Sequence, residues 1–151
     1  MQILHNSDAA PPPEAELSLL TTLANAVGAQ YPFCGAVQLI LTDDMHMREL
    51  NRTYRNRDYA TDVLSFDLGP EMASGSPVDS GIGEIYISLD RASHQAAEFG
   101  VPLNAELARL LVHGLLHLAG YDHHTEAELR FMESTTDTFI ESVGLLETRA
   151  R

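Results

Sequence analysis

The 151-residue chain has no lysine, no tryptophan and a single cysteine, Cys34. One thiol excludes an internal disulfide and is usual in a reducing compartment. Because Cys34 lies in the apolar run FCGAVQLILT, we expect a small buried hydrophobic residue rather than a nucleophile. No apolar run approaches the roughly twenty residues of a membrane span, and the N-terminal residues lack the pattern of a signal peptide. These absences predict a cytoplasmic protein without membrane association.

Positive charge is also scarce, since 22 acidic residues oppose 9 basic ones and give a formal net charge of -13. Such an excess argues against nucleic-acid binding, because affinity for phosphate depends on compensating cations. All nine basic residues are arginine, however, and four of them fall within ten positions: Arg48, Arg52, Arg55 and Arg57. The simplest interpretation of this segment is a solvated helix face followed by a loop. The alternative is a phosphate site, because local charge can attract an anion against an unfavourable overall field.

The length and the 44% hydrophobic composition suit one domain over residues 1–151. Hydrophobic periodicity predicts strands at 2–5, 36–42, 62–67 and 82–89, and helices at 10–28, 43–54, 90–99, 104–118 and from 126 onward. Prolines open the first helix, and Gly28 is expected to end it. Residues 68–81 are rich in Gly, Ser and Pro, which predicts an exposed loop. The mixture lacks strict βαβ alternation and therefore predicts an α+β fold, an irregular α/β sandwich with about four strands in a small mixed sheet and about five helices.

Three of the seven histidines fall in the stretch HGLLHLAGYDH. His113 and His117 are four residues apart, so a helix places them on one face with Cβ atoms about 6 Å apart, at the edge of a leucine stripe. Gly120 is expected to end this helix in the left-handed conformation, and a capping box starts the next helix beyond His123. The third imidazole can therefore return to the first two. We predict a metal site formed by His113, His117 and His123.

The spacing H-x-x-x-H-x-x-G-x-x-H is the ligand frame of the metzincin proteases, in which three histidines hold zinc and leave a fourth position for water. His124 is an alternative third ligand, but His123 has the matching spacing. The other histidines have no such partners and are expected to have surface or local hydrogen-bonding roles: His5, His46 and His94. Peptide hydrolysis by this frame uses a glutamate after the first histidine as general base, and Gly114 occupies that position here. A different reaction is therefore expected.

HGLLHLAGYDH, together with NRTYRNRDYATDVLSFD and GIGEIYIS upstream, resembles the bacterial rRNA maturation factors, the YbeY-like endoribonucleases. The resemblance covers about Leu41 to Glu133. It implies a metal-dependent hydrolase, usually with zinc, that cuts single-stranded RNA, matures the end of small-subunit rRNA and takes part in ribosome quality control. It also implies that His113, His117 and His123 bind one Zn²⁺ per chain, with another transition metal as the alternative, and that Arg55 is the functional arginine. The implied partners are single-stranded RNA, rRNA and the small ribosomal subunit, and neither DNA nor a membrane is expected.

Three positions depart from the pattern of that family. Ala60 stands where proline is common before TDVLSF, and Asp67 stands where proline is common after it. Both changes are expected to affect loop rigidity more than chemistry. In that family the residue after the glycine that matches Gly83 is more often aspartate. Glu84 keeps the carboxylate at this position but carries it on a longer side chain.

A three-histidine site with one open position suits phosphodiester hydrolysis, because the metal can acidify a water and polarise a phosphoryl oxygen. Arg55 would contact the phosphate as negative charge builds up, and the alternative role for Arg55 is an ion pair with Asp58 or Asp62. Asp122 either orients a ligand or only supports the turn. Thr61 and Ser65 are expected to line the cleft rather than to act as nucleophiles. The attacking group is left open between metal-activated water and the RNA 2′-hydroxyl.

Two other classes of function stay open at this point. A metalloprotease would keep the histidine frame but would need its general base elsewhere. A ribosome-binding assembly factor would use the metal structurally. A fourth protein ligand, such as His124 or Asp122, would favour that second class.

Overall fold

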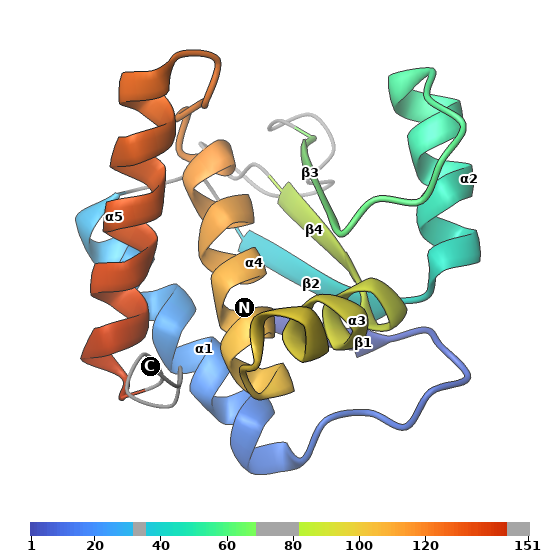
Figure 1. Cartoon of the computed structure of the whole chain (residues 1–151), viewed down its shortest axis with the longest axis horizontal. Coiled ribbons are helices and arrows are strands. Elements are labelled where there is room, and N and C mark those ends of the chain that lie inside the picture. The colour runs from blue at the N-terminus through green and yellow to red at the C-terminus, as the bar shows by residue number, and fades with distance from the viewer. Residues whose placement is uncertain (32–35, 69–81, 145–151) are drawn as a thin grey trace.

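A computed structural model describes residues 1–31, 36–68 and 82–144 (Figure 1). The elements are, in chain order, β1 (Gln2–His5), α1 (Glu14–Gln30), β2 (Ala36–Thr42), α2 (Asp44–Arg55), β3 (Val63–Asp67), β4 (Ile82–Ser88), α3 (Leu89–Phe99), α4 (Leu103–Leu118) and α5 (Glu126–Ser142). The predicted α+β fold is confirmed. The expectation for Cys34 lies outside the described residues, as does nearly all of the loop predicted at 68–81.

The four strands form one mixed sheet in the order β1-β2-β4-β3. The pairs β1–β2 and β2–β4 are parallel, whereas β3 runs antiparallel to β4 at one edge. Leu39 and Ser65 both pair with Ile85, so these three residues point to the same side of the sheet. The register therefore decides which side chains of the edge strand β3 meet the helices.

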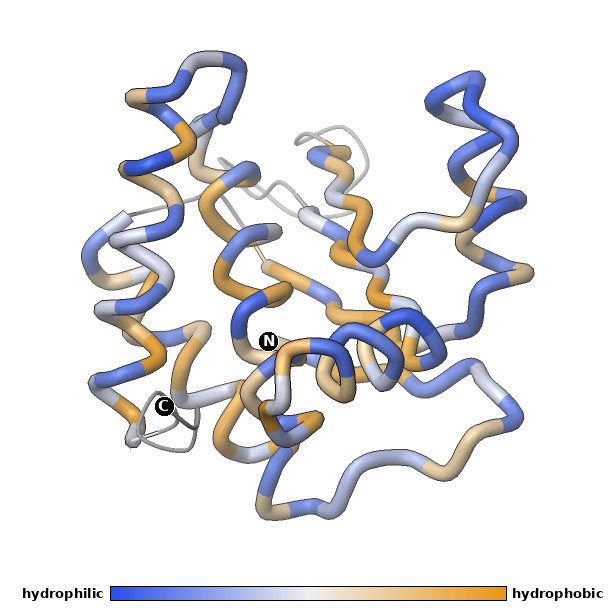
Figure 2. The backbone as a smooth tube through the Cα atoms, viewed as in Figure 1, coloured by the Kyte–Doolittle hydropathy of each residue, from blue (hydrophilic) through white to orange (hydrophobic). Residues whose placement is uncertain are grey.

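One face of the sheet carries the hydrophobic core and is covered by α4 (Figure 1). Its strand residues are fully or almost fully buried: Val37, Leu39, Leu41, Ile85 and Ile87. From α4, Leu107, Leu111 and Leu115 are each 0% exposed and belong to the same core. In Figure 2 the central strands of the sheet and much of α4 are coloured as hydrophobic, whereas α2 is mostly hydrophilic. Burial of the leucine stripe thus fixes α4 on the sheet.

The opposite face of the sheet is only partly covered, by α2. Tyr86 alternates with the buried Ile85 and Ile87, and its ring lies 5.9 Å from that of His46 on α2. The Nδ1 atom of His46 also lies 2.9 Å from the Thr42 hydroxyl, which confirms the expected local role of this histidine. This second face therefore combines half-buried aromatic and polar side chains.

Most element boundaries agree with the sequence within one or two residues. The start of α1 differs most, since the helix begins at Glu14 rather than at residue 10. At its other end Gly28 does not stop the helix, since α1 continues to Gln30 and the N–H of Tyr31 still donates to the Val27 carbonyl at 2.7 Å. A glycine inside a helix costs about 1 kcal/mol, and the burial of Val27 and Leu23 in the core outweighs that cost. Among the described helices, none is long and apolar enough to span a bilayer.

Candidate metal centre

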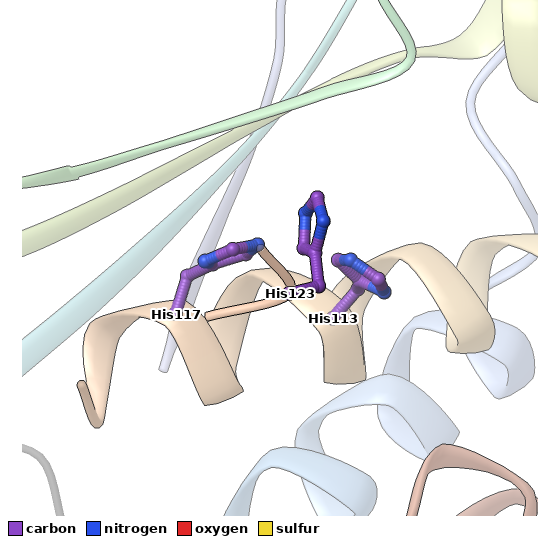
Figure 3. A group of neighbouring side chains, drawn as sticks. All are labelled: His113, His117 and His123. Atoms are coloured by element: carbon purple, nitrogen blue, oxygen red, sulfur yellow. The ribbon is translucent and has the colours of Figure 1, made fainter. Parts of the chain in front are cut away.

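The three histidines of HGLLHLAGYDH converge at one end of α4 (Figure 3). The ring centroids of His113 and His117 are 5.2 Å apart, and the ring of His123 lies 5.3 and 5.1 Å from them. Each residue offers one ring nitrogen, and these nitrogens all lie within 4.8 Å of one another. The predicted convergence of the three imidazoles is confirmed.

The turn after α4 brings the third histidine back. Gly120 adopts φ 99°, and its N–H donates to the His117 carbonyl at 3.0 Å. The N–H of Tyr121 donates to the Leu116 carbonyl, also at 3.0 Å. This pair of hydrogen bonds is a Schellman motif, and it requires a left-handed residue at its centre, which glycine adopts without a Cβ penalty. The expected left-handed Gly120 is therefore found, and it reverses the chain toward the histidines.

The start of α5 fixes the other side of His123. Thr125 and Glu128 form the predicted capping box, and the Glu128 carboxylate also accepts the N–H of His124 at 3.1 Å. One oxygen of Asp122 accepts the N–H of His123 at 2.8 Å, and the other lies 2.9 Å from His124 Nε2. Asp122 thus supports the turn, as one of its two suggested roles requires.

The His124 ring pairs with Asp122 and is 82% exposed. Neither residue belongs to the group of converging ligand atoms among the described residues. The site therefore offers three protein nitrogens, as in zinc sites that keep an open coordination position.

An aromatic cluster that no local sequence pattern predicts also holds this turn. The ring of Tyr121 lies 5.4 Å from Tyr31, edge to face, and 5.1 Å from Phe131 on α5. Tyr31 further contacts Phe131 and Phe139, at 6.2 and 6.0 Å. Tyr121 stands between His117 and His123 in sequence, so the cluster ties the end of α1 and α5 to the segment that carries His123. No periodicity in the sequence pairs Tyr31 with Tyr121.

Burial keeps two of the imidazoles neutral. It lowers the pKa of His113 to about 4, with further lowering by His117, His123 and Arg109. Burial also lowers the pKa of His117, chiefly because the charged form loses water. Neutral imidazole is the form that binds a transition metal, so these two nitrogens are available as ligands at neutral pH. The donor set fits zinc.

Gly114 lies where a side chain has no room. A Cβ atom at this position would lie 2.9 Å from Cγ2 of Ile85 and 3.0 Å from the hydroxyl oxygen of Ser65. The close approach of β3 and β4 to α4 therefore excludes the glutamate that metzincin proteases carry here. The Ser65 hydroxyl donates instead to the Gly114 carbonyl at 3.2 Å.

Arg55 lines the same cleft as the three histidines. Its Nη2 atom donates to the Ser65 carbonyl at 2.7 Å, and its guanidinium lies 5.0 Å from the centre of the Phe66 ring. Asp58 is paired with Arg48 at 2.8 Å, so the suggested pairing of Arg55 with Asp58 is not found. The cleft has a volume of about 690 Å³, and its lining includes the three histidines, Arg55 and residues 61–65. Thr61 and Ser65 line it as expected.

Glu84 lies on the other face of the sheet. It pairs with Phe66 in the β3–β4 register, and its carboxylate accepts a hydrogen bond from the Tyr86 hydroxyl at 3.1 Å. Ala60, Asp67 and Glu84 depart from the family pattern, and of these three Asp67 lines the cleft. The longer carboxylate of Glu84 therefore leaves the histidine site itself unchanged.

Comparison with known proteins decides the family. The family model described as "Endoribonuclease YbeY" matches residues 14–144. The chain belongs to the YbeY endoribonuclease family. This result confirms the resemblance seen in the sequence.

Individual relatives give the same answer. A Moorella thermoacetica protein named "Endoribonuclease YbeY" is 46% identical over 142 residues, which cover 89% of this chain and 91% of that protein. A Myxococcus xanthus protein of the same name is 43% identical over 129 residues, covering 85% of this chain but 44% of the longer protein. The solution structure of the Thermotoga maritima protein TM1509 matches with a TM-score of 0.61 and 28% identity, over 94% of this chain and 89% of that one.

Proposed function

We propose that this chain is a zinc-dependent endoribonuclease that hydrolyses phosphodiester bonds of single-stranded RNA, with its hydrolase domain spanning residues 1–151. We further propose that it acts on rRNA of the small ribosomal subunit, in maturation and quality control. The observation that supports this function best is that three convergent imidazoles and one arginine share a single cleft in a member of this family.

In the proposed mechanism, His113, His117 and His123 hold the metal ion through one neutral nitrogen each. A bound zinc ion supplies Lewis-acid chemistry, polarising a phosphoryl oxygen and acidifying water. Arg55 binds the phosphate and stabilises its growing negative charge, because a guanidinium carries five N–H donors in a planar fork. The hydrogen bond to the Ser65 carbonyl and the contact with Phe66 hold that fork at the edge of the cleft. Preorganised charge of this kind is usually a large part of catalysis.

The chain provides no serine nucleophile in this mechanism. Ser65 lines the cleft, but its hydroxyl donates to the Gly114 carbonyl rather than to a basic side chain. A serine without an adjacent base is a weak nucleophile. Water or the 2′-hydroxyl of the RNA therefore attacks the phosphorus, and an RNA substrate that lacks the 2′-hydroxyl at the cleaved position distinguishes the two.

Metal analysis of the purified protein tests this function, with a His117→Ala variant beside the wild type. The wild type is expected to carry about one zinc per chain and to cleave a single-stranded RNA, and the variant to lose both. His94→Ala is the matched control, because this histidine lies on α3 outside the converging group. A protein that holds zinc but never cleaves RNA, even on the ribosomal subunit, would support a structural metal in an assembly factor. Digestion of casein without RNA cleavage would support a protease instead.

A further inference from the structure

A row of aromatic rings crosses the partly covered face of the sheet and ends beside the cleft. Tyr86 contacts Phe66 with ring centroids 5.8 Å apart, and Phe66 contacts Tyr54 on α2 at 5.5 Å. The guanidinium of Arg55 lies 5.0 Å from the centre of the same Phe66 ring. Tyr54 and Arg55 thus both contact the Phe66 ring, and Arg55 also lines the cleft that contains the three histidines.

Tyr54 is the exposed end of this row. Its side chain stays 66% exposed although it lies in the last turn of α2, against a strand residue. A tyrosine ring carries a large apolar surface, and leaving it in water gives up the free energy of burial. The contact with Phe66 meanwhile limits the freedom of the ring. An exposed and oriented aromatic ring is a ready surface for stacking.

The charge around Tyr54 favours an anionic ligand. Residues 48–57 contain four arginines and one glutamate, in a chain whose net charge is -13. Asp58 is the next acidic residue along the chain, and Arg48 engages both of its carboxylate oxygens, at 2.8 and 3.2 Å. Arg52 and Arg55 lie in the last turn of α2 together with Tyr54. This short segment is therefore locally cationic and aromatic, the combination by which proteins bind single-stranded nucleic acids.

We propose that Tyr54 forms a stacking subsite for one unpaired base of the RNA strand, in the nucleotide whose phosphate binds Arg55 or in an adjacent one. This proposal rests on the proposed function and adds a residue that contacts a base of the substrate. Tyr54 and Arg55 are consecutive residues held against one ring, so the base and the phosphate that they bind belong to the same or adjacent nucleotides. A base within a duplex is stacked on its neighbours and does not present a free face. The subsite therefore selects single strands over duplexes through binding rather than through the chemical step.

Steady-state cleavage of a single-stranded RNA by the zinc-loaded full chain tests this subsite. Tyr54→Ala is expected to raise KM about tenfold with kcat changed less than twofold, since stacking on an aromatic ring contributes to affinity at this scale. Tyr54→Phe is expected to restore KM, because the ring and not the hydroxyl binds the base. Tyr59→Ala is the matched control, as Tyr59 is 51% exposed, follows this segment in the loop after α2, and its hydroxyl accepts a hydrogen bond from Arg57. Its KM is expected to equal that of the wild type.

Substrates that each lack one base complete the test. In the wild type, removing the base at one fixed position relative to the cleaved bond is expected to raise KM about tenfold, and Tyr54→Ala is expected to be insensitive to that same removal. Equal KM values for wild type and Tyr54→Ala, or an unchanged response to every missing base, would overturn the stacking subsite while RNA cleavage itself stands. A wild type that cleaves no RNA would instead overturn the proposed function.

Discussion

The Ser65 hydroxyl donates a hydrogen bond to the Gly114 carbonyl at 3.2 Å, and this contact joins the edge strand β3 to the helix that carries two of the histidines. The approach is close enough that a Cβ atom on Gly114 would lie 3.0 Å from that hydroxyl oxygen and 2.9 Å from Cγ2 of Ile85. The helix α4 therefore lies close to the sheet at residue 114. Proteases with the same histidine pattern carry their general base at this position.

Gly114→Ala is expected to destabilise the protein. The new methyl group overpacks a site where Ile85 is 0% exposed, at a cost of about 1–3 kcal/mol, whereas alanine regains about 1 kcal/mol of helix propensity. We expect a net loss of about 1 kcal/mol in the free energy of unfolding, measured by urea denaturation. In the Ser65→Ala background the hydroxyl oxygen is absent, so the same substitution should cost less. Equal costs in both backgrounds would show that the contact with Ser65 does not limit the space.

Tyr121→Ala is expected to lower zinc affinity roughly tenfold, because groups that hold a ligand in place commonly contribute at least that much. The ring contacts with Tyr31 and Phe131 hold the turn that presents His123. Without these contacts zinc binding must also order the turn, and this ordering lowers the affinity for zinc. Tyr121→Phe keeps the ring and should retain affinity. Competition with a chromophoric chelator provides the measurement.

A second substitution checks whether the Tyr121 effect passes through Tyr31. Tyr31→Ala should weaken zinc binding in the wild type but add little in the Tyr121→Ala variant, because both changes break the same contact. Leu129→Ala is the control, since Leu129 is a 39% exposed side chain of α5 that is not part of the aromatic cluster. Fully additive losses would contradict the role of this contact.

Arg55→Lys is expected to reduce kcat for RNA cleavage by roughly two orders of magnitude while zinc content stays at one per chain. Lysine keeps the positive charge but cannot reproduce the planar fork that binds two phosphate oxygens. Arg52→Lys, in the same helical turn, is the control and should retain kcat within a fewfold range. A loss of zinc in Arg55→Lys would show that the arginine supports the site rather than acting on the phosphate.

The metal-free protein is expected to lose stability as the pH falls from about 6.5 to about 4. An unfolded histidine takes up its proton near pH 6.5, whereas burial lowers the pKa of His113 to about 4 in the folded state. The unfolded state therefore binds more protons in this window, and the equilibrium shifts toward unfolding. Urea midpoints between pH 7.5 and 4 should fall less steeply for His113→Asn than for the wild type. Identical slopes would contradict a neutral, half-buried His113.

Local features of this chain were predictable from sequence because their partners are near in the chain. The pair His113 and His117 follows from the helical repeat, and Gly120 and the capping box fix the turn that returns His123. The leucine stripe likewise predicted one buried face of α4, whereas the burial of Val112 and Leu116 on the other side of the helix was not predicted. Gly28 shows the limit of local rules, since the packing of α1 carried the helix past a residue that favours its end.

The sequence by itself determined the α+β class, the elements and the three histidines that converge, because helix periodicity and turn chemistry act over a few residues. Only the tertiary structure decided that Arg55 shares a cleft with those histidines, because β3 must pair with β4 before its Ser65 carbonyl can hold the guanidinium. It also decided why residue 114 is glycine and what supports the turn at Tyr121. These contacts join segments far apart in the chain, and their geometry depends on how the sheet and the helices pack together.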